Sequence, residues 1–404
     1  MTPITLLGAD LRQPLTEPRA AVSAADPAHV VVAAILAPAT PEDDWDCVAF
    51  TTRNGGDSWQ QRRLGIERCI DPWVVFADED TVQFAGIRIS RDPGDDDPLD
   101  LVFSRSVDGG ENWSEPRLVR RRFEHPILLV HRDEVLLYGR HSAPRGDDTA
   151  AHILELVRPG VAEPAVRQLA EASTADSRLM GTGLTEHGER RLYAGYFDYG
   201  GGNGTGDQGS RHGEAWGLAL KDGDAAPDPV RITGACAGSR TEAPLFPGYP
   251  FLTGAAGHLY HACIAPDHAG LLFSRSADGK HWSGAMRLDD MPDGFLALTP
   301  MLAAAGDGAV LAGWQERDPD SGCQRLVLRA SADHGQTFGP PVAPRNEPSC
   351  PLAEANGRAG SSWPGGGDYS GIAVDTRGRF HVVWAATDGG QYRIAYTVIE
   401  VIEE

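Results

Sequence analysis

The amino-acid sequence predicts one all-β domain over residues 1–404, folded as a seven-bladed β-propeller of four-stranded antiparallel blades. Three observations lead to this prediction. A short turn pattern returns at a nearly constant spacing, and each period holds four short runs of β-forming residues. No segment shows a 3.6-residue apolar period over 11 or more residues, as an amphipathic helix would. A six-bladed ring is the alternative if the fourth region is irregular.

The recurring turn has the form Ser/Thr-x-Asp-x-Gly-x-x-Trp/Phe. It is complete at residues 106–113 and 331–338, carries Asn in place of Asp at 52–59, and is one residue shorter at 276–282. The first two copies begin 54 residues apart and the last two 55, whereas 170 residues separate the middle pair. Two repeats without a complete copy therefore fit between them. In such a turn Asp accepts backbone N–H groups, Gly takes positive φ and the aromatic ring packs over the blade.

Each period divides into four predicted strands. In the second blade these include residues 73–76, 81–89, 100–105 and 117–119, separated by Gly, Asp and Pro clusters. The first strands of the seven blades are expected to begin near Val30, Trp73, Ile127, Leu179, Phe251, Leu298 and Ile372. The last blade ends on a third strand at residues 392–401. We expect residues 4–7 to supply its fourth strand, because closing the ring with the opposite terminus removes a free sheet edge.

The charge of the chain bounds its partners. The formal net charge is −21, and the longest basic run is residues 120–122. Nucleic acid and anionic membrane surfaces are therefore excluded as expected partners, and a small-molecule or glycan ligand fits better. No run approaches the roughly 20 apolar residues of a membrane span.

The cysteines and the N-terminal residues indicate the cellular compartment in which the protein is expected. The six cysteines are widely spaced and contain no Cys-x-x-Cys pair, so no zinc site is expected. Residues 1–10 have no basic start and no long apolar stretch, which favours a cytoplasmic protein with free thiols. Export is not excluded, and in that case some cysteines would pair.

The turns and the segment 367–375, followed by residues 381–384, resemble the Asp-box family of propellers that includes bacterial sialidases. The resemblance implies that the turns lie between third and fourth strands, and that function lies on the opposite face. It does not imply the sialidase reaction. In sialidases an Arg-Ile-Pro segment on the first blade supplies a substrate-binding arginine, whereas residues 26–32 here contain no arginine. Sialidases also have six blades.

Carboxylates stand just before six of the seven predicted first strands, often followed by proline. They are Asp26, Asp71, Glu124 with its neighbour His125, Asp176, Glu242, and Asp368 with its neighbour Tyr369. First strands line the central channel, so these groups are expected to ring one mouth of it. Crowded carboxylates raise one another's pKa and can form a general acid and base, or hold Ca²⁺. The alternative is that each carboxylate only caps its own turn.

Further polar groups on the same predicted face are candidates for positioning a substrate. They are Arg140, His141, Arg211, His212, Arg240 and Trp363. Two long insertions, residues 197–214 and 344–367, fall on this face, where binding loops are common.

We therefore expect a carbohydrate-active enzyme, glycosidase-like or lyase-like, with no required cofactor and with its site at the channel mouth. The candidate catalytic residues are Asp71, Glu124, His125, Asp176, Glu242, Asp368 and Tyr369. A non-catalytic glycan- or protein-binding propeller is one alternative, and a cytoplasmic tailoring enzyme for a small molecule is another. The upper loops differ from blade to blade, which favours one central site over seven equal ones.

Overall fold

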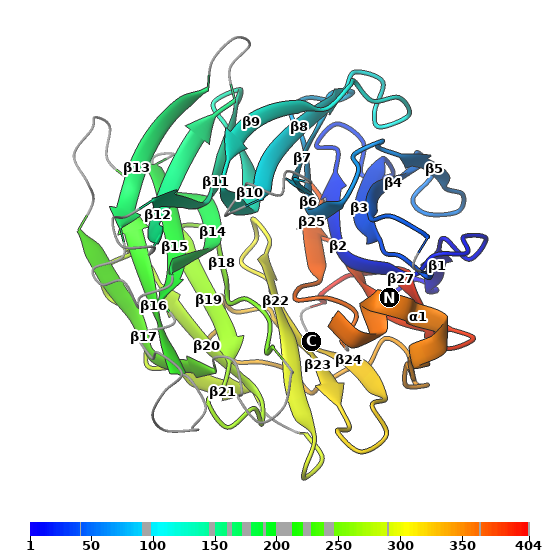
Figure 1. Ribbon diagram of the computed structural model, residues 1–404. Coiled ribbons are helices and arrows are strands. Elements are labelled where there is room, and N and C mark those ends of the chain that lie inside the picture. Colours follow the sequence, from blue (N-terminus) through cyan, green and yellow to red (C-terminus); the bar gives the residue numbers. More distant parts are fainter. Residues whose placement is uncertain are drawn as a thin grey trace.

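The computed structural model describes residues 1–40, 42–90, 98–144, 150–159, 164–171, 179–188, 191–198, 212–220, 228–237, 246–288, 291–362 and 365–402. Seven antiparallel sheets are arranged as a ring, with β2, β6, β10, β14, β18, β22 and β25 nearest its centre (Figure 1). The seven-bladed propeller predicted from the sequence is confirmed.

The first three blades follow one another along the chain. The first contains β2 (Leu15–Val22), β3 (Val30–Leu36), β4 (Asp46–Thr52) and β5 (Gln60–Arg63). The second contains β6 (Cys69–Phe76), β7 (Val82–Ile89), β8 (Leu99–Ser106) and β9 (Arg117–Arg121). The third contains β10 (Phe123–His131), β11 (Glu134–Pro144), β12 (Ala150–Arg158) and β13 (Ala165–Glu171).

The next three blades continue the ring. The fourth contains β14 (Leu179–His187), β15 (Arg191–Asp198), β16 (His212–Ala219) and β17 (Pro229–Ala237). The fifth contains β18 (Phe251–Ala255), β19 (His258–Ile264), β20 (Leu271–Ser276) and β21 (Met286–Leu288). The sixth contains β22 (Leu296–Ala304), β23 (Val310–Arg317) and β24 (Gln324–Ser331). Two isolated bridges, Leu328 with Val342 and Gln324 with Ser349, take the place of its fourth strand.

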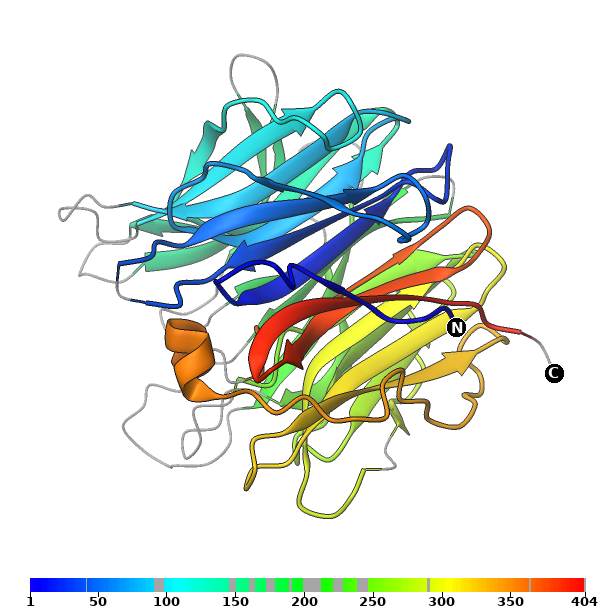
Figure 2. The same ribbon diagram turned by 90° about the vertical axis from the view of Figure 1, so that its right-hand side faces the viewer.

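The seventh blade is built from both ends of the chain. It contains β25 (Gly371–Val374), β26 (Phe380–Asp388), β27 (Gln391–Ile399) and β1 (Thr5–Leu7). Thr5 pairs with Tyr396 and Leu7 with Ile394, so the N-terminal strand completes the last sheet as predicted (Figure 2). The ring is thereby closed by backbone hydrogen bonds between the two ends of the sequence.

The predicted start of the first blade is wrong. Val30 was expected to begin its first strand, but it begins β3, which is the second strand, and β2 is the innermost one. Residues 15–22 were not recognised as a strand because Glu17 and Pro18 interrupt the apolar pattern, at the point where the pairing of β2 with β3 shifts register. Proline is tolerated there because the innermost strand has one edge without a partner strand.

The repeated turns follow the third strand of their blades, and their hydrogen bonds are local. Ser106 Oγ–H donates to Asp108 Oδ1 at 2.8 Å, and the same oxygen accepts the backbone N–H of Asn112 at 2.9 Å. Trp113 Nε1–H donates to the Gly110 carbonyl at 3.1 Å. Burial acts to raise the pKa of Asp108, but its hydrogen bonds outweigh burial and lower the pKa to about 2. Asp108 is therefore ionised at neutral pH, and its carboxylate stabilises the turn in which it lies.

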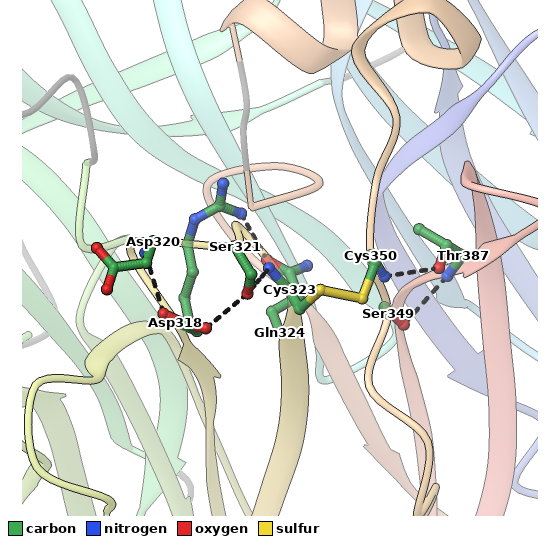
Figure 3. Close-up of a disulfide and its surroundings, with 9 residues drawn as sticks. Asp318, Asp320, Ser321, Cys323, Gln324, Ser349, Cys350 and Thr387 are labelled. Atoms are coloured by element: carbon green, nitrogen blue, oxygen red, sulfur yellow. Dashed lines mark hydrogen bonds between the residues drawn. A yellow bond between two sulfur atoms is a disulfide. The ribbon is translucent and has the colours of Figure 1, made fainter.

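The expectation of free thiols is wrong, because all six cysteines form disulfides. Cys47–Cys69 joins β4 to β6, and Cys236–Cys263 joins β17 to β19, so each links neighbouring blades. Cys323–Cys350 ties the turn after β23 to the segment that leads from the sixth blade to the seventh (Figure 3). The partners are 22 to 27 residues apart in sequence, and only the packing of adjacent blades brings them together.

Cys350 also contacts the seventh blade. Its backbone N–H donates to Thr387 Oγ1 at 3.1 Å, and the Thr387 N–H donates to Ser349 Oγ at 3.1 Å (Figure 3). The third disulfide is thus part of a contact that spans the sixth and seventh blades.

One helix occurs among the described residues, α1 (Ala353–Ser362), inside the insertion 344–367. The sequence did not predict it, because the helix is short and is interrupted at Gly357, whose φ of 49° and ψ of −126° are not helical. Its Ala359 packs against the first blade. Asn356 fixes it to the turn between β26 and β27: its Nδ2–H donates to the Gly390 carbonyl at 2.8 Å, and its Oδ1 accepts the Tyr392 N–H at 2.8 Å. In Figure 2, α1 lies on the side of the ring away from the labelled termini. No helix within the described ranges has the length and apolar character that a bilayer span requires.

The third disulfide is expected to be reduced first. Cys350 is exposed, whereas Cys47, Cys69, Cys236 and Cys263 are fully buried. Mild phosphine treatment of the folded protein, followed by alkylation and mass spectrometry, should label Cys323 and Cys350 alone. In the chain-entropy description, a C323S/C350S variant loses about 3 kcal/mol of unfolding free energy. Equal labelling of all six cysteines under native conditions would contradict this order.

Candidate active site at the channel mouth

The first strands of four blades carry the same distortion near the channel mouth. Glu17, Asp71, His125 and Thr299 have φ values of 53°, 52°, 53° and 47°, and each is followed by proline. Each lies within a register shift against the second strand of its blade. Such a bulge re-aims side chains, and a non-glycine residue in the left-handed region costs about 1–3 kcal/mol. Four strained residues in equivalent positions indicate that this geometry serves a function.

Three of these positions follow the period of the repeated turns. Glu17, Asp71 and His125 are spaced 54 residues apart, which is also the spacing of the first two turns. Sequence reasoning missed Glu17 because it took Asp26, also followed by proline, as the member from the first blade. Asp26 is exposed and accepts the Ala28 N–H at 2.9 Å, so it caps a turn. Extending the 54-residue spacing back from Asp71 would have identified Glu17.

The structure brings Asp71 and Asp368 together with Glu17. Glu17 Oε1 accepts the backbone N–H of Asp368 at 3.0 Å. The Tyr369 hydroxyl donates to Asp71 Oδ1 at 3.5 Å, and the His125 backbone N–H donates to Asp71 Oδ2 at 3.3 Å. Glu17, Asp71 and His125 come from the first, second and third blades, whereas Asp368 and Tyr369 precede β25 of the seventh. Residues far apart in sequence thus form one carboxylate cluster on the axis.

The segment before β25 can reach Glu17 only through glycine. The Glu17 N–H donates to the Gly366 carbonyl at 3.2 Å. Gly367 has a φ of 125°, and a Cβ there would lie 2.3 Å from Glu17 Cγ. This close approach requires glycine at 367, and at 366, where φ is 82°, a Cβ would lie 2.4 Å from the Ala385 Cβ.

Burial raises the pKa of all three carboxyl groups. Burial and then the neighbouring Asp71 raise the pKa of Asp368 to about 7. Burial raises that of Asp71 to about 6, although the His125 N–H and the Arg19 charge oppose the rise. Burial, with Asp368 and Asp71 nearby, raises the pKa of Glu17 well above its usual range. All three carboxyl groups therefore keep their protons to a higher pH than an exposed carboxyl group does, and of the two aspartates Asp368 has the higher pKa.

Two further groups in the cluster stay uncharged. Burial lowers the pKa of His125 to about 3, and the Arg19 charge adds to this, so its imidazole is neutral. Burial, followed by the charges of Glu17 and Asp71, raises the pKa of Tyr369 well above its ordinary value. Tyr369 is therefore a phenol that can donate a proton.

Aromatic residues surround these groups. The rings of His125 and Tyr249 lie 4.3 Å apart between centroids, and those of His125 and Tyr369 lie 5.5 Å apart. Tyr249 belongs to the segment 246–250, which contacts the sixth and seventh blades. The Thr299 N–H of the sixth blade donates to the Pro247 carbonyl at 2.8 Å. The Tyr249 N–H donates to the Asp368 carbonyl, next to the seventh blade, at 3.4 Å. One side of the mouth is thus covered, and its wall is aromatic.

The channel continues past the cluster as a cavity of about 140 Å³. Its lining includes Arg19, Trp73, Thr182, Phe251 and Leu302, which come from five first strands. None of Glu17, Asp71 and Asp368 lines this cavity. Arg19 lines this cavity and also stacks on Tyr369 of the cluster, so it contacts both.

Of the other candidate residues predicted from the sequence, some lie near the carboxylate cluster and others lie elsewhere or outside the described residues. Arg140 forms an ion pair with Glu124 and is close enough to lower the pKa of Asp71. The side chain of His141 instead faces Glu155, with 3.2 Å between Nδ1 and Oε1, in a separate group with Arg120. Asp176, Arg211, Arg240, Glu242 and Trp363 lie outside the described residues. His212 begins β16, but its side chain is not among those described.

Sequence reasoning missed Glu17, Arg19 and Tyr249. The 54-residue spacing could have located Glu17, and Arg19 follows it by two residues on the same strand. Nothing in the sequence indicated that Tyr249 would reach across the mouth. Among the described residues, no group of three or more His, Cys, Asp or Glu side chains is arranged to hold a metal ion.

Comparison with known proteins yields structures but no sequence relatives. No protein-family model and no curated protein matches the chain. An α-L-arabinofuranosidase of Fusarium graminearum aligns over 79% of this chain and 93% of its own, at 14% identity and a TM-score of 0.53. A protein of unknown function from Dyadobacter fermentans aligns over 99% of this chain and 98% of its own, at 14% identity and a TM-score of 0.52. A Penicillium chrysogenum α-L-arabinanase with arabinobiose aligns over 74% and 88%, at 14% identity and a TM-score of 0.50.

These likenesses concern the fold, and they support the propeller expected from the sequence. Sialidases also align, with lower TM-scores. Several of the structural neighbours are glycosidases.

Replacing Asp368 by Asn should stabilise the protein at high pH only. The folded-state pKa of about 7 exceeds the ordinary value of 3.8, so the native protein binds the extra proton and loses stability as the pH rises from about 4 to 7. An asparagine side chain cannot ionise, so Asp368→Asn should gain about 1 kcal/mol or more at pH 8 relative to pH 4.5. Urea unfolding at both pH values measures this difference, with Asp26→Asn as control. An equal effect of Asp368→Asn at both pH values would contradict the raised pKa.

Proposed function

We propose that this protein is a carbohydrate-active enzyme that hydrolyses a glycosidic bond at the channel mouth, with Asp368 as general acid and Asp71 as general base. The observation that carries the proposal is the buried cluster in which Glu17 Oε1 accepts the Asp368 N–H and the Tyr369 hydroxyl donates to Asp71, so that two aspartates from different blades meet where burial raises the pKa of both. Glycoside hydrolysis needs such a pair: one carboxyl group protonates the leaving oxygen, and the other acts on the nucleophile.

The roles follow from the contacts of each group. Asp368 holds its proton to a higher pH than Asp71, so it is the group able to protonate the departing sugar oxygen. Asp71 takes the proton of the attacking hydroxyl, and the Tyr369 hydroxyl lies against it at 3.5 Å. Tyr369 therefore acts as nucleophile: its oxygen bonds to the sugar carbon as the leaving oxygen departs with the Asp368 proton. Water then cleaves the glycosyl-tyrosine, giving its proton to Asp368 while Asp71 returns a proton to the tyrosine oxygen. Glu17, whose pKa burial raises well above its usual range, accepts the Asp368 N–H and so fixes the backbone of the acid.

The surroundings suit a sugar. Tyr249 is partly exposed and packs on the buried His125 ring, so its own ring is the aromatic surface on which a pyranose or furanose would stack. Arg140, held by Glu124, supplies hydrogen-bond donors at the rim. The arabinose-acting enzymes among the structural neighbours support α-L-arabinofuranosides as the first substrates to test.

We also infer that the recurring turns are Asp boxes. Their support is the hydrogen bonding of Asp108 within its turn and their place after third strands.

Asp108→Ala should then lower the unfolding temperature and leave kcat unchanged, and a selective loss of kcat would contradict a structural role.

The two carboxylates should differ in their dependence on the leaving group. General acid or base assistance contributes roughly 10²–10⁴-fold, so Asp71→Asn should lower kcat/KM by at least about 100-fold on nitrophenyl glycosides and disaccharides alike. Asp368→Asn should lower it by that factor on a disaccharide but far less on a nitrophenyl glycoside, because nitrophenolate leaves without a proton. Kinetics on both substrate types test this, with Asp26→Asn as the matched Asp-Pro control. Full turnover by both site variants would remove the proposed roles.

The pH dependence of kcat/KM should be a narrow bell. Activity should fall below about pH 6, where Asp71 gains a proton, and above about pH 7, where Asp368 loses its own. These midpoints describe the interacting pair. Asp368→Asn should abolish the alkaline limb, measured with a nitrophenyl glycoside, and its persistence in that variant would assign the acid to another group.

A further inference from the structure

Arg19 is a buried cation at the hub of the propeller. Its side chain is 5% exposed and projects from β2, two residues after Glu17. Its Cζ lies 4.1 Å from the ring centroid of Trp73, 4.7 Å from that of Phe251 and 4.2 Å from that of Tyr369. The three rings come from the second, fifth and seventh blades, so one guanidinium contacts aromatic groups from three other blades.

This cation has no direct carboxylate partner among the described residues. Nη1–H donates to the Ser370 carbonyl at 3.1 Å, whereas Nε and Nη2 make no hydrogen bond within the described part of the chain. Ring faces therefore stabilise its charge at contact distance, and the carboxylates of the cluster act on it from further away.

We propose that Arg19 is a positioning residue for the reaction: it holds Tyr369 against Asp71 by stacking on the phenol ring and binding the Ser370 carbonyl, and it presents its positive charge to Asp71. The inference rests on the proposed function. It adds a role for a residue that stacks on the Tyr369 ring and lines the channel cavity next to the cluster.

The positioning part follows from two simultaneous contacts. The guanidinium lies over the Tyr369 ring while one of its N–H groups binds the next residue, so both the ring and its backbone are fixed. Arginine is suited to this because it is planar and carries several donors, whereas lysine is a point charge. Lysine at this position would keep the charge but lose the combined stacking and bonding.

The charge part follows from the groups around Asp71. Those facing it are Tyr369, His125, Arg19, Arg140, Glu17 and Asp368. Burial raises the pKa of Asp71, and Arg19 is the larger of the two cationic influences that oppose the rise. Arg19 remains charged at neutral pH, because burial lowers its pKa only to about 10. The same charge favours loss of the Tyr369 proton.

The test compares Arg19→Met, which removes the charge, with Arg19→Lys, which keeps it. The Asp71 carboxyl carbon is followed by ¹³C NMR across pH without substrate and assigned with Asp71→Asn. An opposite charge nearby shifts a carboxyl pKa by about 1–3 units, so Arg19→Met should raise the Asp71 midpoint by about one pH unit or more. Arg19→Lys should leave the midpoint close to that of the wild type. Arg287→Met, at an exposed ion pair with Asp267, should not move it.

Kinetics supply the second readout. Arg19→Met should shift the acidic limb of the kcat/KM pH profile to higher pH, together with the titration midpoint of Asp71. Arg19→Lys should leave both limbs of the profile at the wild-type pH values but should lower kcat, because Tyr369 is no longer held in place. An unchanged Asp71 midpoint in Arg19→Met, with activity lost equally at all pH values, overturns the inference. If Arg19→Met does not fold, a wild-type kcat in Arg19→Lys overturns it. A shifted midpoint in a protein inactive on every glycoside tested supports the Arg19 charge effect and rejects the proposed function.

Discussion

The site depends on the unpaired inner edge of the first strands. An innermost strand has a neighbour on one side only, so a missing N–H and a local bulge disrupt no second ladder. The protein places X-Pro pairs there in four blades, and the residue before each proline adopts φ near +50°. Each bulge redirects side chains near the channel mouth. Strands paired on both sides could not hold Glu17, Asp71 and His125 in this conformation.

The arrangement has an energetic cost that the rest of the fold must offset. Each left-handed residue stores about 1–3 kcal/mol, and buried carboxyl groups lose hydration as they ionise. Arg19 offsets part of this, because its charge favours ionised Asp71 while aromatic rings replace water around the guanidinium. The two effects together leave acids that titrate near neutrality, whereas Asp108 of a repeated turn titrates at about 2.

Periodicity made most of the fold predictable, and the same periodicity explains the errors. The spacing of the turns located six of the seven first strands and the closing role of residues 4–7. It failed for the first blade, because the apolar run from Val30 outweighed the interrupted strand containing Glu17. The position just before a predicted first strand identified four residues of the cluster: Asp71, His125, Asp368 and Tyr369. Contacts between blades are different, because they do not repeat along the chain. Neither the packing of Tyr249 on His125 nor the three disulfides could be predicted from the repeat.

The position of the cluster links the candidate active site to ring closure. Glu17 comes from the first blade and Asp368 from the seventh, and the Glu17–Asp368 and Glu17–Gly366 hydrogen bonds cross the seam where the ends of the chain meet. Gln324, next to Cys323, donates to the Gly365 carbonyl at 2.8 Å, so the third disulfide supports the segment that carries Asp368. A displacement of the seventh blade relative to the first would separate Asp368 from Glu17. Strand β1 and the disulfides at the periphery therefore help to hold the geometry of the acid at the hub.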